Sequence, residues 1–283
     1  MDKKNSLDDR LSISFHQTFI PERLYITAFL RFVANGMTGT DQEISELTGI
    51  PVGKSSGKVP AIIHYCIGMG LVSVDKNIKT ALRIYHLTPF GRSVLLEDPN
   101  LSEDLSQWLA HLYLCRRQGG AEIWHLCFAK GHDVLGMKFS EQELTAYLER
   151  ICGNRSRSVI GPLIRTYEEP ASLKKAGILS RSNEVITRSP APLISGFRNG
   201  YSALLLFLWD DHFFGEHQVT VTDFEKETFW QKLTGWDSRQ NEIALEMIHE
   251  TGAIRIDKQM RPWVLIRCTE TNKYWTSLYD ELA

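Results

Sequence analysis

The sequence has no apolar run long enough to cross a bilayer. Its longest strongly apolar stretch, Tyr201–Trp209, has nine residues, whereas a membrane-spanning helix needs about 20. The opening residues, MDKKNSLDDRLSIS, lack the apolar segment of a signal peptide. The five cysteines include no Cys-x-x-Cys pair, which argues against a disulfide framework or a zinc site. We therefore expect a cytoplasmic protein with no membrane contact.

Catalytic motifs are also missing. Gly49 and the Gly53-Lys54-Ser55 run resemble a phosphate-binding loop, but three residues separate the two glycines where that loop needs four. The residues before Gly49 favour a helix, whereas a phosphate-binding loop follows a buried strand. His212 and His217 lie five residues apart, a spacing that does not suit metal ligands on one helix. We predict no enzyme, no cofactor and no metal site; a nuclease that uses Asp211 or Glu216 is the least favoured alternative.

Charge is distributed unevenly along the chain. Residues 50–92 carry six Lys/Arg against one Asp/Glu, and residues 150–198 carry nine against three. Residues 93–149 and 199–283 are acidic, with four against nine and eight against fourteen. Two basic segments in an acidic chain are typical of a surface that binds a polyanion. The alternative is that these segments pair with the acidic ones inside the fold.

The first 98 residues follow the order of a winged helix-turn-helix domain. Helical periodicity covers residues 21–36, 40–49 and 60–70, and Thr40 with Glu43 forms a capping box that starts the second helix. Two β-type runs at 71–75 and 81–88 form the wing, and a helix leaves it at 87–96. In this arrangement the turn before the third helix faces the major groove of DNA.

Side chains suited to phosphates lie at that turn and on the wing. Lysines and arginines neutralise phosphates, serines donate hydrogen bonds to them, and glycines let the backbone approach. His64 and Lys58 are the residues that we expect to reach base edges. The DNA-binding residues predicted in this domain are Lys54, Ser55, Ser56, Lys58, His64, Lys76, Lys79 and Arg83.

The C-terminal region, residues 201–283, repeats the order with a different charge. Residues 222–235, with Thr222 and Glu225 as a capping pair, and residues 237–252 predict two helices, and strands at 253–257 and 262–268 form a second wing. The second helix carries mostly carboxylates, which a phosphate-lined groove disfavours. We interpret this domain as an interaction or dimerisation module, with Arg255, Lys258 and Arg261 as its only candidates for DNA contact.

The middle region, residues 99–200, is predicted to be mostly helical. Ser140 and Glu143 form a capping box. Arg155 and Arg157 lie at the start of a predicted helix that continues to Arg165, and arginines at a helix N-terminus favour an anion site. The alternatives for these arginines are a solvated loop or pairing with the acidic residues of 93–149.

Several stretches resemble the uncharacterised bacterial family DUF4007. The stretches are FHQTFIPERLYI, TGIPVGKSSGKVPAIIHYCIGMGLV, LTPFGRSVLLEDPNLSEDLSQWLAHLYL and SVIGPLIRTYEEPASLKKAGIL. The resemblance extends from about Phe15 to the C-terminus, although Gln17 replaces an acidic residue that is common in the family. The resemblance implies a locus for DNA sulfur modification (phosphorothioation) or phage defence, beside a phosphoadenosine-phosphosulfate-reductase-like enzyme.

The sequence thus predicts a mainly α protein with small β wings (α+β), in which two winged helix-turn-helix-like domains flank a helical middle segment. We expect a non-catalytic accessory protein that binds duplex DNA and positions a sulfur-transfer or reductase-like partner enzyme. A second copy of the chain is a further candidate partner. The alternatives are a protein–protein adaptor without DNA contact and a transcription regulator of its own operon.

Overall fold

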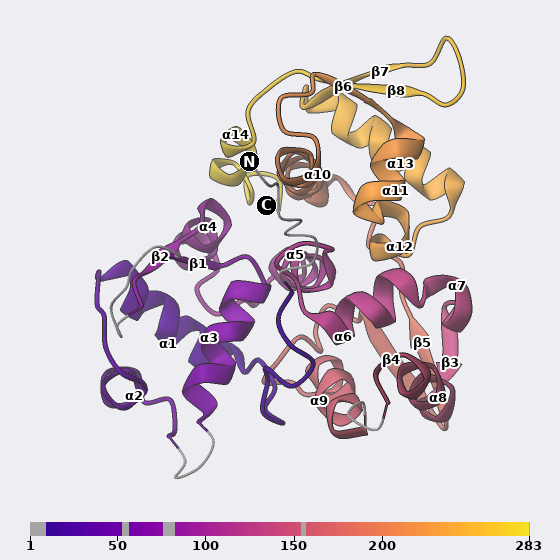
Figure 1. Cartoon of the computed structure of the whole chain (residues 1–283). Helices are drawn as coiled ribbons and strands as arrows, with labels where there is room; N and C mark the ends of the chain where they lie inside the picture. The colour runs from indigo at the N-terminus through magenta and orange to yellow at the C-terminus, as the bar shows by residue number, and fades with distance from the viewer. Residues whose placement is uncertain (1–9, 53–56, 76–82, 154–156, 283) are drawn as a thin grey trace, which may run out of the picture. The chain divides into compact units, whose positions relative to one another are not determined.

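The computed structural model describes residues 10–52, 57–75, 83–153 and 157–282. The chain divides into two compact units, Met1–Ser189 and Pro190–Ala283 (Figure 1). Both are helical with small antiparallel sheets, which confirms the predicted α+β class. The three domain boundaries from the sequence stay predictions. No described helix combines the length and hydropathy needed to cross a membrane.

The first unit begins with three helices, a ribbon and a fourth helix. Further helices and a second small sheet follow in the same unit. Its elements are α1 (Arg23–Ala34), α2 (Asp41–Thr48), α3 (Lys58–Gly68), β1 (Val72–Val74), β2 (Tyr85–Leu87), α4 (Pro89–Glu97), α5 (Asp104–Cys115), α6 (Glu122–His125), the π-helical turn η1 (Leu126–Lys130), α7 (His132–Leu135), β3 (Lys138–Ser140), α8 (Glu141–Cys152), α9 (Arg157–Glu168), β4 (Leu179–Ser182) and β5 (Val185–Arg188).

Local capping signals set the ends of α2 and α8. Thr40 accepts a hydrogen bond from the backbone N–H of Glu43, and the Glu43 side chain accepts one from Thr40 in return. Gly49 ends α2 in the left-handed conformation that glycine adopts easily. Ser140 and Glu143 form the same reciprocal pair at α8. These predicted caps are confirmed.

The ribbon follows α3 directly. β1 and β2 pair antiparallel, from Val72 with Leu87 to Val74 with Tyr85. Thr88 then caps α4 by accepting a hydrogen bond from the N–H of Gly91. A Cβ at position 91 would lie 1.9 Å from the carbonyl oxygen of Leu71. Only glycine therefore lets α4 approach the strand end so closely.

The middle of the first unit contains a sheet that the sequence prediction omitted. β5 lies between β3 and β4, and both pairings are antiparallel. The strands have only three or four residues, and β3 lies about 40 residues before the hairpin of β4 and β5, so neither periodicity nor a short hairpin reveals β3. The prediction of a helical middle segment is therefore incomplete, because it lacks this sheet.

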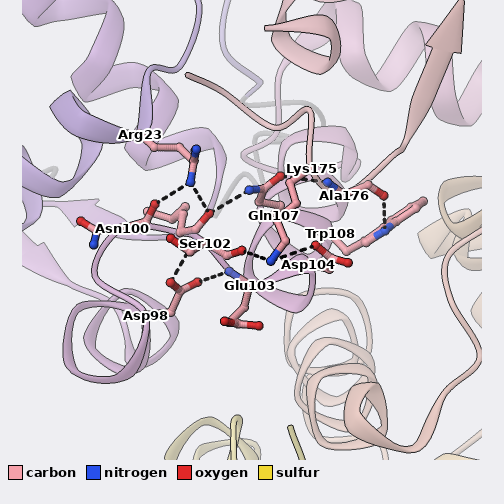
Figure 2. A network of polar contacts seen from close by, with 11 residues as sticks. Arg23, Asp98, Asn100, Ser102, Glu103, Asp104, Gln107, Trp108, Lys175 and Ala176 are labelled. Carbon is pink, nitrogen blue, oxygen red and sulfur yellow. Dashed lines mark hydrogen bonds and ion pairs between the residues drawn. The ribbon is translucent and has the colours of Figure 1, made fainter. Parts of the chain in front are cut away.

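A polar network connects the first helices to this middle segment, as Figure 2 shows. Arg23 on α1 donates hydrogen bonds to the carbonyl oxygens of Asn100 and Pro170. The buried carboxylate of Asp98 accepts the backbone N–H groups of Ser102 and Glu103, at 2.7 and 2.9 Å. The buried Gln107 bridges the carbonyl of Leu101 and the N–H of Ala176 (Figure 2). This network connects residues before and after position 98, the predicted end of the first domain, within one unit.

The second unit has its own three-stranded sheet, with the strand order β6-β8-β7. Its elements are η3 (Ser195–Phe197), α10 (Arg198–His212), β6 (Gln218–Thr220), α11 (Val221–Thr228), α12 (Trp230–Thr234), α13 (Ser238–Glu250), β7 (Ile254–Asp257), β8 (Val264–Arg267) and α14 (Asn272–Thr276). The predicted helix at 237–252 and the two wing strands are confirmed as α13, β7 and β8.

The predicted start of the helix at 222–235 is wrong by two residues. Thr220, rather than Thr222, caps α11, and it accepts a hydrogen bond from the N–H of Asp223. This register buries Phe224. The helix also breaks at Phe229, which has a positive φ of 59° between α11 and α12.

Candidate nucleic-acid interface

Several of the predicted DNA-binding residues fall outside the residues that the structure describes. They are Lys54, Ser55, Ser56, Lys76, Lys79 and Arg155. Arg157 is described as the first residue of α9, without its side chain. Lys58, His64, Arg83 and Arg165 are described in full, and their surroundings test how much positive charge the protein leaves exposed to a ligand.

Lys58, the first residue of α3, is bound within the protein. Its Nζ lies 2.6 Å from Oε1 of Glu22, and the two side chains are 16% and 28% exposed. The ammonium also lies 5.4 Å from the ring centroid of Phe19 and 4.7 Å from that of Tyr25. A carboxylate here also offsets the unfavourable position of a cation at a helix N-terminus. These contacts weigh against the predicted contact between Lys58 and a phosphate.

Arg83 is exposed and lies beside a polar group formed by α2, α3 and β2. It hydrogen-bonds the Tyr85 side chain. Burial lowers the pKa of His64, the positive charge of Arg83 lowers it further, and Asp41 opposes this shift. His64 is therefore neutral at pH 7, and Arg83 is the exposed cation of this group.

The helix α3 presents little surface to a groove. Seven of its eleven residues are buried, and the other four, Lys58, Pro60, His64 and Ile67, are only half-buried. A recognition helix in the major groove presents several side chains to base edges. The burial of α3 therefore favours contacts from the loops at its ends over base readout along its face.

Arg165 lies on the exposed side of α9. Its Nη2 donates to the carbonyl oxygen of Thr18 at 3.0 Å. Gln17 and Thr18 both have positive φ values, 46° and 73°. The guanidinium is thus tied to the turn before α1. The neighbouring His16 is buried, and burial, followed by the nearby Arg165 charge, lowers its pKa to about 4.

In the second unit, two cations of the loop between β7 and β8 pair with the acidic helix, whereas Arg255 on β7 is exposed. Lys258 forms an ion pair with Glu246, and Arg261 forms one with Glu242 at 2.9 Å. Both cations also lie over the ring of Trp263. A sequence pattern predicts this pairing: two carboxylates four residues apart share one face of a helix, and two cations three residues apart lie in the loop that follows. Carboxylates thus neutralise Lys258 and Arg261.

No metal centre is found in the described part of the chain. Within it, no three His, Cys, Asp or Glu side chains gather in a way that could hold an ion. Asp210 instead forms an ion pair with Arg267 and accepts a hydrogen bond from Thr271. Asp211 and Glu216 are exposed.

Comparison with known proteins places the chain in a family. The model of the family described as protein of unknown function, DUF4007, matches residues 13–162, more than half of the chain. The chain belongs to the DUF4007 family. The matched residues run from before α1 to the start of α9, and they include the α1–α3 helices and the β1–β2 ribbon. A search of the curated proteins finds no match.

Two solved structures share the fold of this DUF4007 protein. One is described as "Magnesium ion-bound SspB crystal structure", with a TM-score of 0.69 and 14% sequence identity. The other is described as "SspB crystal structure", with a TM-score of 0.67 and 16% identity. Each match covers 96% of this chain and 88% of the other. At these identities the similarity shows the fold alone, and it extends over both units.

Proposed function

We propose that this protein is a non-catalytic DNA-binding accessory protein whose first unit grips the backbone of duplex DNA. The grip comes from basic residues between α2 and α3 and between β1 and β2. In the sequence, Lys54, Ser55 and Ser56 lie between the two helices, and Lys76 and Lys79 lie between the two strands, before the exposed Arg83.

The observation that carries this proposal is the element order of the first unit. Three helices that pack on one another are followed at once by an antiparallel ribbon and a capped helix. This is the order of a winged helix-turn-helix domain, which contacts DNA with the start of its third helix and with its wing. The basic residues of segment 50–92 concentrate in those two places. Because α3 is mostly buried, backbone contacts would dominate, and binding would depend strongly on salt.

The biological setting follows from the family resemblance. DUF4007 relatives are expected in loci for DNA phosphorothioation and phage defence, beside a phosphoadenosine-phosphosulfate-reductase-like enzyme. We therefore propose that the protein positions such a partner enzyme on duplex DNA and that the sulfur chemistry belongs to the partner.

A salt titration of DNA binding tests the first part of the proposal. The Lys76→Ala/Lys79→Ala/Arg83→Ala variant should bind a duplex more weakly than the wild type. Each lost phosphate contact should reduce the slope of log affinity against log salt by about 0.9, and three lost contacts by about 2.7.

The matched control removes the same charge elsewhere in the first unit. Lys130, Lys138 and Lys174 are exposed, and their triple alanine variant should keep the wild-type slope. Equal losses in both variants would mean that the ribbon has no special role. A discrete footprint at one promoter that resists salt would instead favour a transcription regulator.

A second function, protein docking by the second unit, is favoured by its paired charges. Because Glu242 and Glu246 neutralise Arg261 and Lys258, the wing has few cations for phosphates. Ile243 on α13 and Met260 at the wing tip are 43% and 80% exposed. The Ile243→Asp/Met260→Asp variant should lose the partner enzyme in a nuclease-treated pull-down and keep its DNA affinity. Retention of the partner would contradict docking at this face.

A further inference from the structure

Four side chains near the starts of α1 and α3 form what we call the Lys58 cluster: Phe19, Glu22, Tyr25 and Lys58. Glu22 supplies the carboxylate at 2.6 Å from the ammonium, and the two rings lie within 5.4 Å of it. The lysine is only 16% exposed. Its charge is therefore satisfied inside the protein by a carboxylate and two ring faces.

Lys58 follows directly after the basic loop proposed to grip DNA. Gly57 is the N-cap of α3 and has an extended backbone; because glycine has no side chain, it gives α3 no side-chain cap. A lysine at this place would extend the phosphate-binding loop by one cation if its ammonium turned outward. The Glu22 carboxylate already neutralises the Lys58 ammonium, and it would repel a phosphate brought to the same cation, so the two anions compete for Lys58.

We propose that Glu22 is an autoinhibitory residue, which withholds Lys58 from the DNA backbone and so limits the affinity of the first unit. This inference rests on the proposed DNA-binding function and adds a regulatory contact to it. Any event that removes the Glu22 charge or displaces its carboxylate would release one more cation next to the basic loop.

A double-mutant cycle on the full chain, read out by salt titration of duplex binding, tests the inference. Glu22→Gln should bind more tightly and steepen the log–log salt slope by about 0.9, the value for one added phosphate contact. The gain at about 50 mM salt should therefore exceed the gain at about 200 mM by about 3.5-fold. Lys58→Ala should leave wild-type binding unchanged, and the Glu22→Gln/Lys58→Ala variant should lose the whole gain.

Two control variants distinguish loss of the Glu22–Lys58 contact from loss of one negative charge. Asp104→Asn removes one negative charge at an exposed ion pair with Lys175, where the charged atoms lie 3.7 Å apart; it should leave the slope unchanged. Glu22→Asp keeps the charge but shortens the side chain by one methylene, and it should give part of the gain. Glu22 makes no side-chain capping bond to α1, so circular dichroism should show a wild-type fold in these variants.

The outcomes distinguish this inference from the function on which it rests. Wild-type binding without a steeper slope in Glu22→Gln would overturn the inhibitory role of Glu22 and leave DNA binding intact. Weaker binding by Lys58→Ala alone would also overturn it, because Lys58 would then already reach DNA. No binding by either the wild type or Glu22→Gln would remove the proposed function itself.

Discussion

Replacement of Asp98 by alanine should weaken the polar network that connects the first helices of the first unit to its middle segment. The carboxylate is 5% exposed and accepts two backbone N–H groups, those of Ser102 and Glu103. These bonds fix the turn that leads into α5 and place the carbonyl oxygens to which Arg23 and Gln107 donate (Figure 2). Alanine leaves both amides without their acceptor.

The expected loss of stability follows from the number and kind of these bonds. A hydrogen bond to a charged group contributes about 1.5–3 kcal/mol. Ser102 is half-buried and Glu103 is exposed, so water can replace part of the interaction, and the lower end of the range applies to each. We expect a decrease in the free energy of unfolding of about 3 kcal/mol, with a smaller decrease for Asp98→Asn, which keeps one acceptor oxygen.

Urea unfolding followed by circular dichroism measures this loss. At a denaturant dependence of about 3 kcal/mol per molar, the midpoint should fall by about 1 M with little change in slope. Glu97→Ala is the control: this neighbouring carboxylate is exposed, and its removal should change stability by less than about 0.5 kcal/mol. A loss below about 1 kcal/mol for Asp98→Ala would refute the structural role assigned to the carboxylate.

Four further perturbations have defined expectations. Acid should destabilise the protein: His16 and His125 are buried with pKa values lowered to about 4, so the unfolded state binds more protons between pH 6.5 and 4. Stability is complete above pH 6.5 and falls by about 3 kcal/mol per histidine as the pH drops to 4; urea midpoints that do not change between pH 7 and 4.5 would contradict this. Gly91→Ala should destabilise by about 3 kcal/mol or more, because its Cβ would meet the Leu71 carbonyl at 1.9 Å. Gly161→Ala, within α9 and with no atom in reach of its Cβ, should instead be neutral or stabilising by up to about 1 kcal/mol in the same unfolding assay. Glu242→Gln/Glu246→Gln should lower the melting temperature only slightly, since exposed ion pairs contribute at most about 1 kcal/mol each, and the difference should shrink at high salt.

Helix starts that depend on residues a few positions apart could be predicted from the sequence. The capping boxes at Thr40 and Ser140 require only residues three positions apart, so both helix starts could be predicted. The predicted start of α11 was wrong because the sequence contains two threonine–carboxylate pairs, Thr220 with Asp223 and Thr222 with Glu225, only two residues apart. Thr220 with Asp223 forms in the structure, and Phe224 is buried in that register. The choice depends on the core, which the local pattern does not contain.

Contacts between distant residues could not be predicted in the same way. The ion pair of Lys58 joins residues 36 positions apart, and the sheet of β3, β4 and β5 brings together short strands from either side of two helices. For the same reason, charge counts along the sequence do not show which cations a carboxylate neutralises in the fold. Lys58, Lys258 and Arg261 all count as positive charge in the sequence, and all three meet a carboxylate in the fold.

The two units differ in which of their basic residues pair with carboxylates. In the second unit, two carboxylates on α13 pair with Lys258 and Arg261, the two cations of the loop that joins β7 and β8. In the first unit, Glu22 pairs with Lys58, while Arg83 stays exposed beside a neutral His64. Salt should therefore weaken the proposed DNA binding by the first unit, whereas in the second unit it should loosen only the internal ion pairs. If charge reversal of Arg83 left DNA affinity unchanged while Lys258→Glu reduced it, the assignment of DNA binding to the first unit would be wrong.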